Sequence, residues 1–417
     1  MQLADRPSHG VRSDGDVMVH AHHLVNRFRG GHGAEGSYLV DLGHDGRVTL
    51  DISARACTVR HAPRASSNRA TLRTDARTWI AIATGELDGI RAFLDGRLQI
   101  EGDLHAAVRL TSLFEPIGPA HLEVRQLRTR TSRRVEIASL ATGRGTPVVL
   151  LHGLGSSLLS FLPTFVALAE HHEVHVLDLP GFGRSSKPMP TGRRYHPSWM
   201  SEHVRRYVIA HDLGGAHVIG NSMGGRIATE LALTHPTLVR SITGLCPAVA
   251  FDQYQPLRPL LRATVPQWAA VAPVRLPLAA VERAMDQLLH NAESVPPQSR
   301  KAVAEDVVAM VRDRGYRLAT MAAARHLGAE PASGRGAFWR RLALLDVPSL
   351  WIFGRQDVLV HPRYAQRVRA VLPEAQVEVW DQMGHVPQLE RPAETHTTIR
   401  RFVGQLDRLD GAMRRIG

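Results

Sequence analysis

The spacing of hydrophobic positions changes near residue 120. Before that point the apolar runs are short and alternate with polar residues, which is typical of half-buried strands and short amphipathic helices. The pattern predicts strands at 37–42, 48–52, 70–73 and 97–100, and helices at 78–83, 90–94 and 104–110. Together these elements predict a small α+β domain with a core of its own.

After residue 120 the apolar runs become nearly continuous, as in parallel strands that are buried on both faces. Such runs occupy 147–151, 216–219, 348–354 and 377–380. Residues 226–233, which come shortly after the second run, have helical spacing. Buried strands followed by helices predict an α/β fold around a parallel sheet.

Segments that break regular structure suggest where one domain ends and the next begins. Two prolines and a glycine fall within 115–119, where they interrupt any helix or strand. We therefore expect a first domain at 1–114, a linker at 115–133 and a second domain at 134–417.

Within the second domain, residues from about 248 to 345 carry no recognisable motif. This segment contains short amphipathic helical stretches, including 278–285 and 302–311, and several prolines in its earlier part. These stretches predict several short amphipathic helices in this segment.

The chain of 417 residues has a formal net charge of +12, which raises the question of a nucleic-acid partner. The first 120 residues hold 14 arginines and 14 acidic residues, so the excess lies in the remainder. There it is spread as separate arginine pairs, without a dense basic run or an aromatic stacking motif. We interpret it as a solvated surface and expect no nucleic acid. Attraction to acidic ligands or to the headgroups of an anionic membrane surface, with weak membrane contact, is the functional alternative.

Other features of the sequence restrict the cellular setting. Cys57 and Cys246 are too few for a disulfide framework or a zinc site. The first residues lack the apolar core of a signal peptide, and no apolar run reaches the ~20 residues of a membrane span. We therefore expect a soluble, cytoplasmic protein without a metal site, and the sequence indicates no oligomeric state.

The strongest chemical signal is Gly220-Asn221-Ser222-Met223-Gly224-Gly225, which joins an apolar run to a predicted helix. A serine on a sharp strand-to-helix turn is a nucleophile in a strained conformation, and its neighbours need to lack side chains. Gly220 and Gly224 meet that requirement. The turn also places Ser222 at a helix amino terminus, where backbone N–H groups favour developing negative charge.

A nucleophilic serine needs a base and an acid that orients the base. We assign the base to His385 and the acid to Asp357, because each follows the carboxyl end of a predicted strand. Their order along the chain, Ser222, Asp357, His385, is that of one known type of triad. Asp252 is the alternative acid, one strand earlier.

Donors for an oxyanion are expected in the loop His152-Gly153-Leu154-Gly155, which follows the first buried run. We assign this role to the backbone N–H of Leu154 and to that of Met223, the residue after the nucleophile. Gly153 belongs to the same loop and leaves its backbone free of a side chain.

From about residue 134 onward these motifs resemble the α/β-hydrolase superfamily. Residues 178–185 and 385–392 also resemble loops of that family. The resemblance implies an α/β-hydrolase sheet with a helical cap at about 248–345, which would cover the site and exclude water from it. It also implies an enzyme that cleaves a carboxylic ester or acyl (lipid-like) substrate without metal or organic cofactor. Acyl length and leaving group cannot be inferred from it.

The elbow is also similar to that of hydrolases that cleave carbon–carbon bonds in ring-fission dienoates. Those enzymes usually carry an aromatic residue directly after the catalytic histidine, where this chain has Val386. This carbon–carbon hydrolase remains an alternative at this point.

A second set of residues lies in the first domain, and most of it falls between Thr78 and Phe114. The set comprises Trp79, Gly85, Leu87, Phe93, Gly96, Leu98, Ile100, Glu101, Gly102, Asp103, Leu113 and Phe114. Through it, residues 20–114 resemble the sterol-carrier-protein type of lipid-binding domain. The resemblance implies an apolar tunnel for a fatty acyl or sterol ligand, with Trp79, Phe93, Leu98 and Ile100 as candidate contacts. An ordinary filled core is one alternative, and a non-catalytic lipid-transfer protein is the alternative of another class.

Overall fold

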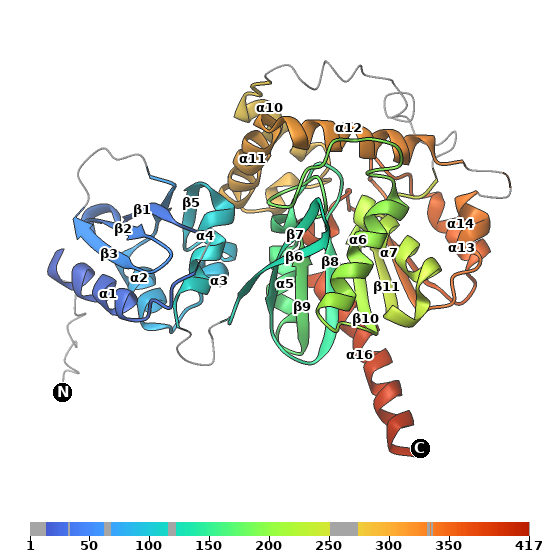
Figure 1. Cartoon of the computed structure of the whole chain (residues 1–417), viewed down its shortest axis with the longest axis horizontal. Coiled ribbons are helices and arrows are strands. Elements are labelled where there is room, and N and C mark those ends of the chain that lie inside the picture. The colour runs from blue at the N-terminus through green and yellow to red at the C-terminus, as the bar shows by residue number, and fades with distance from the viewer. Residues whose placement is uncertain are drawn as a thin grey trace, which may run out of the picture. The chain divides into compact units, whose positions relative to one another are not determined.

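The computed structural model describes residues 14–31, 34–61, 68–115, 122–250, 274–331, 334 and 337–416. The chain divides into two compact units, an N-terminal unit Met1–Val124 and a C-terminal unit Arg125–Gly417 (Figure 1). Strand β6 (Arg125–Ser132) falls inside the expected linker 115–133 and pairs with the following strand. Asp252, the alternative acid, lies outside the described residues.

The N-terminal unit has one mixed sheet with the strand order β3-β2-β1-β4-β5. Strands β1 and β4 are parallel, and the other neighbouring pairs are antiparallel. Its elements are α1 (Asp14–Asn26), β1 (Gly36–Asp41), β2 (Arg47–Ile52), β3 (Cys57–His61), β4 (Ala70–Arg73), α2 (Ala76–Thr84), α3 (Gly89–Leu94), β5 (Gln99–Gly102) and α4 (Leu104–Leu110).

Aspartate caps explain where three helices of this unit begin. The carboxylates of Asp75, Asp88 and Asp103 each accept a backbone N–H from the first turn of α2, α3 and α4. Such a cap satisfies a donor that has no partner within the helix. The sequence therefore specifies locally where these short helices begin.

The C-terminal unit is built on one sheet with the order β13-β12-β11-β10-β8-β9-β7-β6. Strands β13 to β9 in this order are parallel, whereas β7 and β6 are antiparallel to their neighbours. The strands are β6, β7 (Val135–Thr142), β8 (Thr146–Leu151), β9 (His172–Leu177), β10 (Ala216–Asn221), β11 (Val239–Leu245), β12 (Ser349–Gly354) and β13 (Gln376–Trp380).

Helices cover both faces of this sheet. Helices α5 and α16 pack on each other, and α6 and α7 form a second pair in which α7 contacts β10 and β11. The helices are α5 (Leu162–Leu168), α6 (Pro197–Ala210), α7 (Met223–Thr234), α10 (Leu278–Asp286), α11 (Pro297–Arg312), α12 (Arg314–Ala329), α13 (Phe338–Leu342), α14 (Tyr364–Val371), α15 (Pro387–Glu390) and α16 (Pro392–Ile416). No described helix has the length and apolar content that crossing a bilayer requires.

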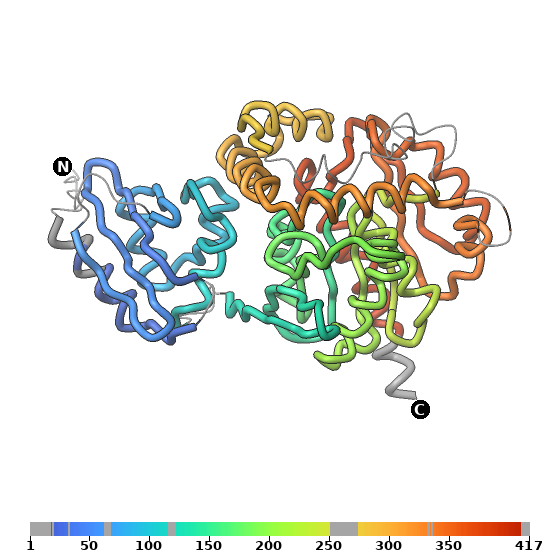
Figure 2. Tube along the Cα trace, turned by 45° about the horizontal axis from the view of Figure 1, so that its top comes forward, coloured from blue at the N-terminus to red at the C-terminus, as the bar shows by residue number. Residues whose placement is uncertain are grey.

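Helices α10, α11 and α12 form a cap within the segment 248–345. Figure 1 shows α12 above the sheet, and in Figure 2, where the top of that view comes forward, the same orange helix runs across the C-terminal unit. The parallel strands end beneath this cap, so the loops after β8, β10, β12 and β13 meet at one edge. In open α/β sheets, ligands bind outside the carboxyl ends of the strands, and here that edge carries the expected catalytic residues.

Candidate active site

Ser222 lies in a strained turn between β10 and α7. Its φ of 52° and ψ of −116° fall outside the regions that a residue with a side chain ordinarily occupies. The backbone holds it there: its N–H donates to Leu245 O at 3.0 Å, and its carbonyl accepts the N–H of Ala248 at 2.9 Å. The strand-to-helix geometry predicted for this serine is therefore present.

Close packing of the backbone explains the glycines around the serine. A Cβ on Gly220 would lie 2.2 Å from the carbonyl carbon of Gly224, and one on Gly224 would lie 2.0 Å from Leu151 O. A Cβ on Gly153 would approach Ser222 Cβ to 3.3 Å. Strand β8, the elbow and α7 can approach so closely only because these positions lack side chains.

His385 and Asp357 form a buried pair. His385 Nδ1 lies 2.8 Å from Asp357 Oδ2, and the other carboxylate oxygen accepts the N–H groups of Leu359 and Val360 at 2.7 and 2.9 Å. A carboxylate with three donors is fixed in position and favours the tautomer in which His385 carries its proton on Nδ1. The Nε2 atom is then available as a base.

Two further contacts position His385 through its backbone. Asn221 Nδ2 donates to the carbonyl of His385 at 3.0 Å and to Leu245 O at 3.0 Å. The N–H of His385 donates to Leu288 O, at the end of α10, at 2.7 Å. The elbow and the cap therefore both hold the histidine loop. The sequence analysis did not identify Asn221 in this role, although it sits inside the elbow motif.

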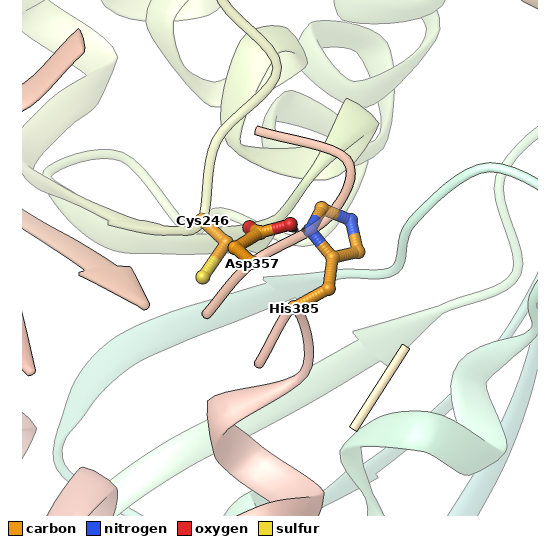
Figure 3. Close-up of side chains that lie close together, drawn as sticks. All are labelled: Cys246, Asp357 and His385. Carbon is orange, nitrogen blue, oxygen red and sulfur yellow. Dashed lines mark hydrogen bonds and ion pairs between the residues drawn. The ribbon is translucent and has the colours of Figure 1, made fainter. Parts of the chain in front are cut away.

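Cys246 lies directly beside the pair (Figure 3). The Cys246 Sγ atom, a carboxylate oxygen of Asp357 and a ring nitrogen of His385 all lie within 4.8 Å of one another. Burial raises the pKa of the Cys246 thiol well above its ordinary value, and the Asp357 carboxylate raises it further. Asp357 and His385 are already bonded to each other, and the second carboxylate oxygen of Asp357 accepts two backbone N–H groups, so these ligand atoms are occupied. This donor set does not fit a metal ion.

The loop that carries Leu154 is anchored by His152 and Asp178. His152 Nδ1 lies 2.7 Å from Gly153 O, and its Nε2 accepts the N–H of Leu179 at 3.0 Å. Asp178 accepts the N–H groups of Leu158 and Arg184 at 2.9 and 2.8 Å. Both side chains are buried and occupied with the backbone, so they shape the loop.

Ser222 and His385 line a common cavity of about 250 Å³ under the cap. Gly153 and Leu154 line the same cavity, while Met223 is the first residue of α7, where N–H groups have no partner within the helix. The remaining wall is largely aliphatic: Met285, Leu288, Leu289, Val295, Val303, Val307, Leu327, Leu359, Val360, Val386 and Leu389. The charge of Arg300 on this wall is compensated by Asp286, whose Oδ1 lies 3.0 Å from its Nη1.

The N-terminal unit encloses a smaller cavity of about 60 Å³. All four candidate lipid contacts, Trp79, Phe93, Leu98 and Ile100, line it. The guanidinium of Arg27, which also lines it, donates to the carbonyl oxygens of Ala83 and Glu115 at 2.7 and 3.0 Å. The cavity wall is otherwise apolar, apart from Thr111.

A parallel sheet with a strand-to-helix elbow, a histidine bonded to a buried carboxylate and a covering cap is the arrangement typical of hydrolases that use a serine nucleophile. The model of the alpha/beta hydrolase fold family matches residues 146–392, more than half of the chain. The chain belongs to this family. The model of the SCP-2 sterol transfer family matches residues 32–115. Both resemblances drawn from the sequence are thereby confirmed.

Relatives of known activity agree with this assignment. The chain is 26% identical over 293 residues to Lipase 3 of Moraxella sp. (strain TA144), covering 67% of this chain and 84% of that protein. It is 27% identical over 268 residues to a pimeloyl-[acyl-carrier protein] methyl ester esterase of Aeromonas hydrophila, covering 63% and 97%. These relatives identify the chain as a hydrolase enzyme, which sets aside the non-catalytic alternative.

A solved structure shows the same architecture. A membrane phospholipase A, described as a bacterial virulence factor, superimposes with a TM-score of 0.56 at 25% identity. The match covers 68% of this chain and 87% of that one.

Proposed function

We propose that the chain hydrolyses carboxylic esters or thioesters of an apolar acyl group, with Ser222 as the nucleophile. One observation carries this proposal: the strained Ser222 and the Asp357-bonded His385 line one cavity whose other walls are mainly aliphatic. The substrate's carbonyl group would lie at the polar end of that cavity, and its acyl chain would lie against the cap.

In the first step, Ser222 Oγ attacks the acyl carbon while His385 Nε2 takes the hydroxyl proton. Asp357 stabilises the imidazolium that forms, because its carboxylate already accepts the Nδ1 proton. The N–H groups of Leu154 and Met223 are proposed to bind the oxyanion. His385 then protonates the departing alcohol or thiol, and the acyl group stays on Ser222.

In the second step, water attacks the acyl-serine with His385 as the base, and the carboxylic acid leaves as Ser222 recovers its proton. The buried, strained turn supports both steps because it fixes Ser222 before the substrate arrives. Preorganisation of this kind removes orientation costs from the reaction barrier.

The N-terminal unit is proposed to hold a fatty acyl or sterol ligand for this reaction. Support comes from the family match and from the apolar cavity that Trp79, Phe93, Leu98 and Ile100 line. A binding domain on the same chain raises the effective concentration of ligand at the hydrolase. In the full chain, Leu98→Asp should weaken binding of a fluorescent fatty acid, because it puts an unpaired charge in an apolar site. Unchanged affinity would contradict this role.

The test of the nucleophile is covalent labelling. Ser222→Ala should lower kcat on a short acyl ester by roughly 10³-fold or more and abolish labelling by a fluorophosphonate. Ser160→Ala is the matched control, since Ser160 lines the same cavity but lies outside the elbow. Labelling that persists in Ser222→Ala, or disappears in Ser160→Ala, would contradict the assignment.

Carbon–carbon bond hydrolysis is the narrower alternative. Val386, which follows the proposed base, lines the cavity and is aliphatic. It therefore offers no aromatic surface of the kind that ring-fission hydrolases usually present there. We favour the ester or thioester substrate for this reason.

A further inference from the structure

A second hollow in the C-terminal unit, of about 410 Å³, is lined by ten residues, of which four are arginines. The β6–β7 turn contributes Arg133 and Arg134, the loop before α6 contributes Arg194, and α6 contributes Arg206. In the sequence these arginines belong to separate pairs and look like an ordinary solvated surface. The fold gathers one or two members of each pair around the same concave surface, which we call the basic pocket.

The basic pocket carries a net charge of +3, from four arginines and one glutamate. That glutamate, Glu202, is already bound by arginines: its carboxylate oxygens lie 2.6 Å from Arg205 Nε and 2.7 Å from Arg206 Nε. These bonds, that to Arg205 first, lower the pKa of Glu202 to about 2. Glu202 therefore orients Arg206 and leaves the charge of the other arginines uncompensated.

The remaining arginines have few protein partners. Arg194 donates to the carbonyl of Met189 at 2.8 Å. Arg133 and Arg134 are exposed, and neither makes an ion pair with a residue in the described part of the chain. Guanidinium groups that converge from three elements on a hollow match the several oxygens of a phosphate group.

The pocket also has a less polar side. Trp199, Val135 and Pro188 line it together with His203. His203 Nδ1 lies 2.7 Å from Thr131 Oγ1, and burial lowers its pKa to about 4, so His203 adds no charge near neutral pH. A half-buried tryptophan beside arginines suits a ligand that combines phosphates with an apolar or aromatic group.

The sheet places the basic pocket on the same edge as Ser222. Strand β7 runs antiparallel to β9, with Ser139 opposite Leu177, so the start of β7 lies beyond the carboxyl end of β9. In the sheet order, β8 and β9 separate β10, which carries the elbow, from β7. At a spacing of about 4.8 Å per strand, the pocket lies roughly 14 Å or more to the side of Ser222.

We propose that the basic pocket binds the phosphorylated end of the substrate's leaving group, at the end of a long arm that reaches to the reacting carbonyl. This rests on the proposed function. Such a substrate is an acyl thioester whose thiol is linked through a flexible chain to a nucleotide diphosphate. Ser222 Oγ bonds to the acyl carbon, the carbon–sulfur bond breaks, and His385 returns the proton to the thiol. A glycerophospholipid does not fit, because only a few bonds separate its phosphate from its ester carbonyls.

The test compares two thioesters with the same acyl group. Decanoyl-coenzyme A carries the phosphates, and the decanoyl thioester of N-acetylcysteamine lacks them. In the full chain, Arg133→Gln with Arg134→Gln should raise KM for the first substrate roughly tenfold or more and leave KM for the second unchanged. Arg144→Gln is the control, since Arg144 is an exposed arginine in the β7–β8 turn, at the opposite edge of the sheet.

Each other result counts against the proposal. Equal changes in KM for both thioesters would indicate a structural role, and a change confined to a phospholipid substrate would refute the long arm. Binding of adenosine 3′,5′-bisphosphate to the Ser222→Ala protein is a second measurement that needs no turnover. If neither the uncharged thioester nor a short acyl ester is hydrolysed, the proposed function fails, while this titration still decides whether the arginines bind phosphate.

Discussion

The proposed triad can be tested by removing the carboxylate at position 357, after β12, and introducing one at position 246, after β11. Cys246 follows β11, and its Sγ atom lies within 4.8 Å of a carboxylate oxygen of Asp357 and of a ring nitrogen of His385. Asp357→Ala alone should lower kcat/KM roughly 10³-fold to 10⁴-fold, because the imidazole loses the carboxylate that orients it. Adding Cys246→Asp should restore at least tenfold of that loss, since the new carboxylate is within reach of the same ring.

On its own, Cys246→Asp should lower the stability of the protein. It would bring a second buried carboxylate to within about 4.8 Å of Asp357. At an effective dielectric constant of 20, two like charges at that distance repel by about 3.5 kcal/mol. We therefore expect the single variant to be destabilised by an amount of that order, and removal of Asp357 to relieve it. A double-mutant cycle of unfolding free energies measures this coupling.

The activity assay needs an uncharged control. Asp357→Ala with Cys246→Asn has nearly the same shape as the rescued variant but lacks the carboxylate. Equal kcat/KM in the aspartate and asparagine versions would refute the reasoning, because the position beside His385 would then be unable to serve as the acid. Rescue by both would indicate that packing, and not charge, is restored.

Three other predictions concern the surroundings of the site. Burial lowers the pKa of His203 to about 4, so between pH 6.5 and 4 mainly the unfolded chain binds this proton. Stability should therefore fall as the pH drops, by on the order of 2 kcal/mol for this histidine at pH 5. His203→Gln should remove this part of the loss and leave the parts that come from His175, His196 and His396. Glu330→Gln should lower the urea-unfolding free energy by about 1.5–3 kcal/mol, because buried Arg226 loses the carboxylate 2.9 Å from its Nη2 and keeps that of Glu230, 2.6 Å away. Tyr316→Phe should lower kcat more than it raises KM, because its hydroxyl holds the carbonyl of Gly155 at 2.7 Å in the proposed oxyanion loop.

Each of these has a result that would contradict it. A pH–stability profile that is identical in His203→Gln would show that the histidine does not contribute to the acid loss. Glu374 is exposed, so Glu374→Gln is the control for Glu330→Gln, and equal effects would show that the buried pair is unimportant. An effect of Tyr316→Phe on KM alone would place the residue in binding and not in the oxyanion loop.

Elements that are buried on all sides are the ones that the sequence predicts best. Strand β12 is buried along its whole length, and its apolar run at 348–354 is plain. Strand β11 is also buried but contains Ser241 and Thr243, and the sequence analysis did not predict it. Ser241 is tolerated because His217 Nδ1 lies 2.7 Å from its hydroxyl, a long-range contact that periodicity does not reveal.

Strand β6 was missed for a different reason. It is an edge strand with β7 as its only neighbour in the sheet, and it contains three arginines. Edge strands commonly carry charge, which prevents pairing with another chain. The segment therefore lacks the alternating apolar positions by which a strand is recognised. Because it also follows the prolines at 116 and 119, the sequence predicted a linker there.

In the candidate site, too, some residues can be predicted from local sequence and others cannot. Ser222, Asp357 and His385 lie in local motifs, so their order along the chain was enough to propose them. Cys246 owes its position to β11 lying next to β12 in the sheet, and the basic pocket owes its charge to three elements that meet only after folding. Neither leaves a local signature in the sequence.

The cap is best understood as part of the catalytic machinery and not only as a cover. The N–H of His385 donates to Leu288 O after α10, and Tyr316 of α12 holds the loop that carries Leu154. Asn291 N–H donates to Glu390 Oε1 at 2.7 Å, and the other oxygen of Glu390 accepts the N–H of Gly384, next to His385. A movement of the cap would therefore displace the proposed base and the proposed oxyanion loop together. If substrate fills the cavity under the cap, we expect it to stabilise this arrangement and so to couple substrate binding to turnover.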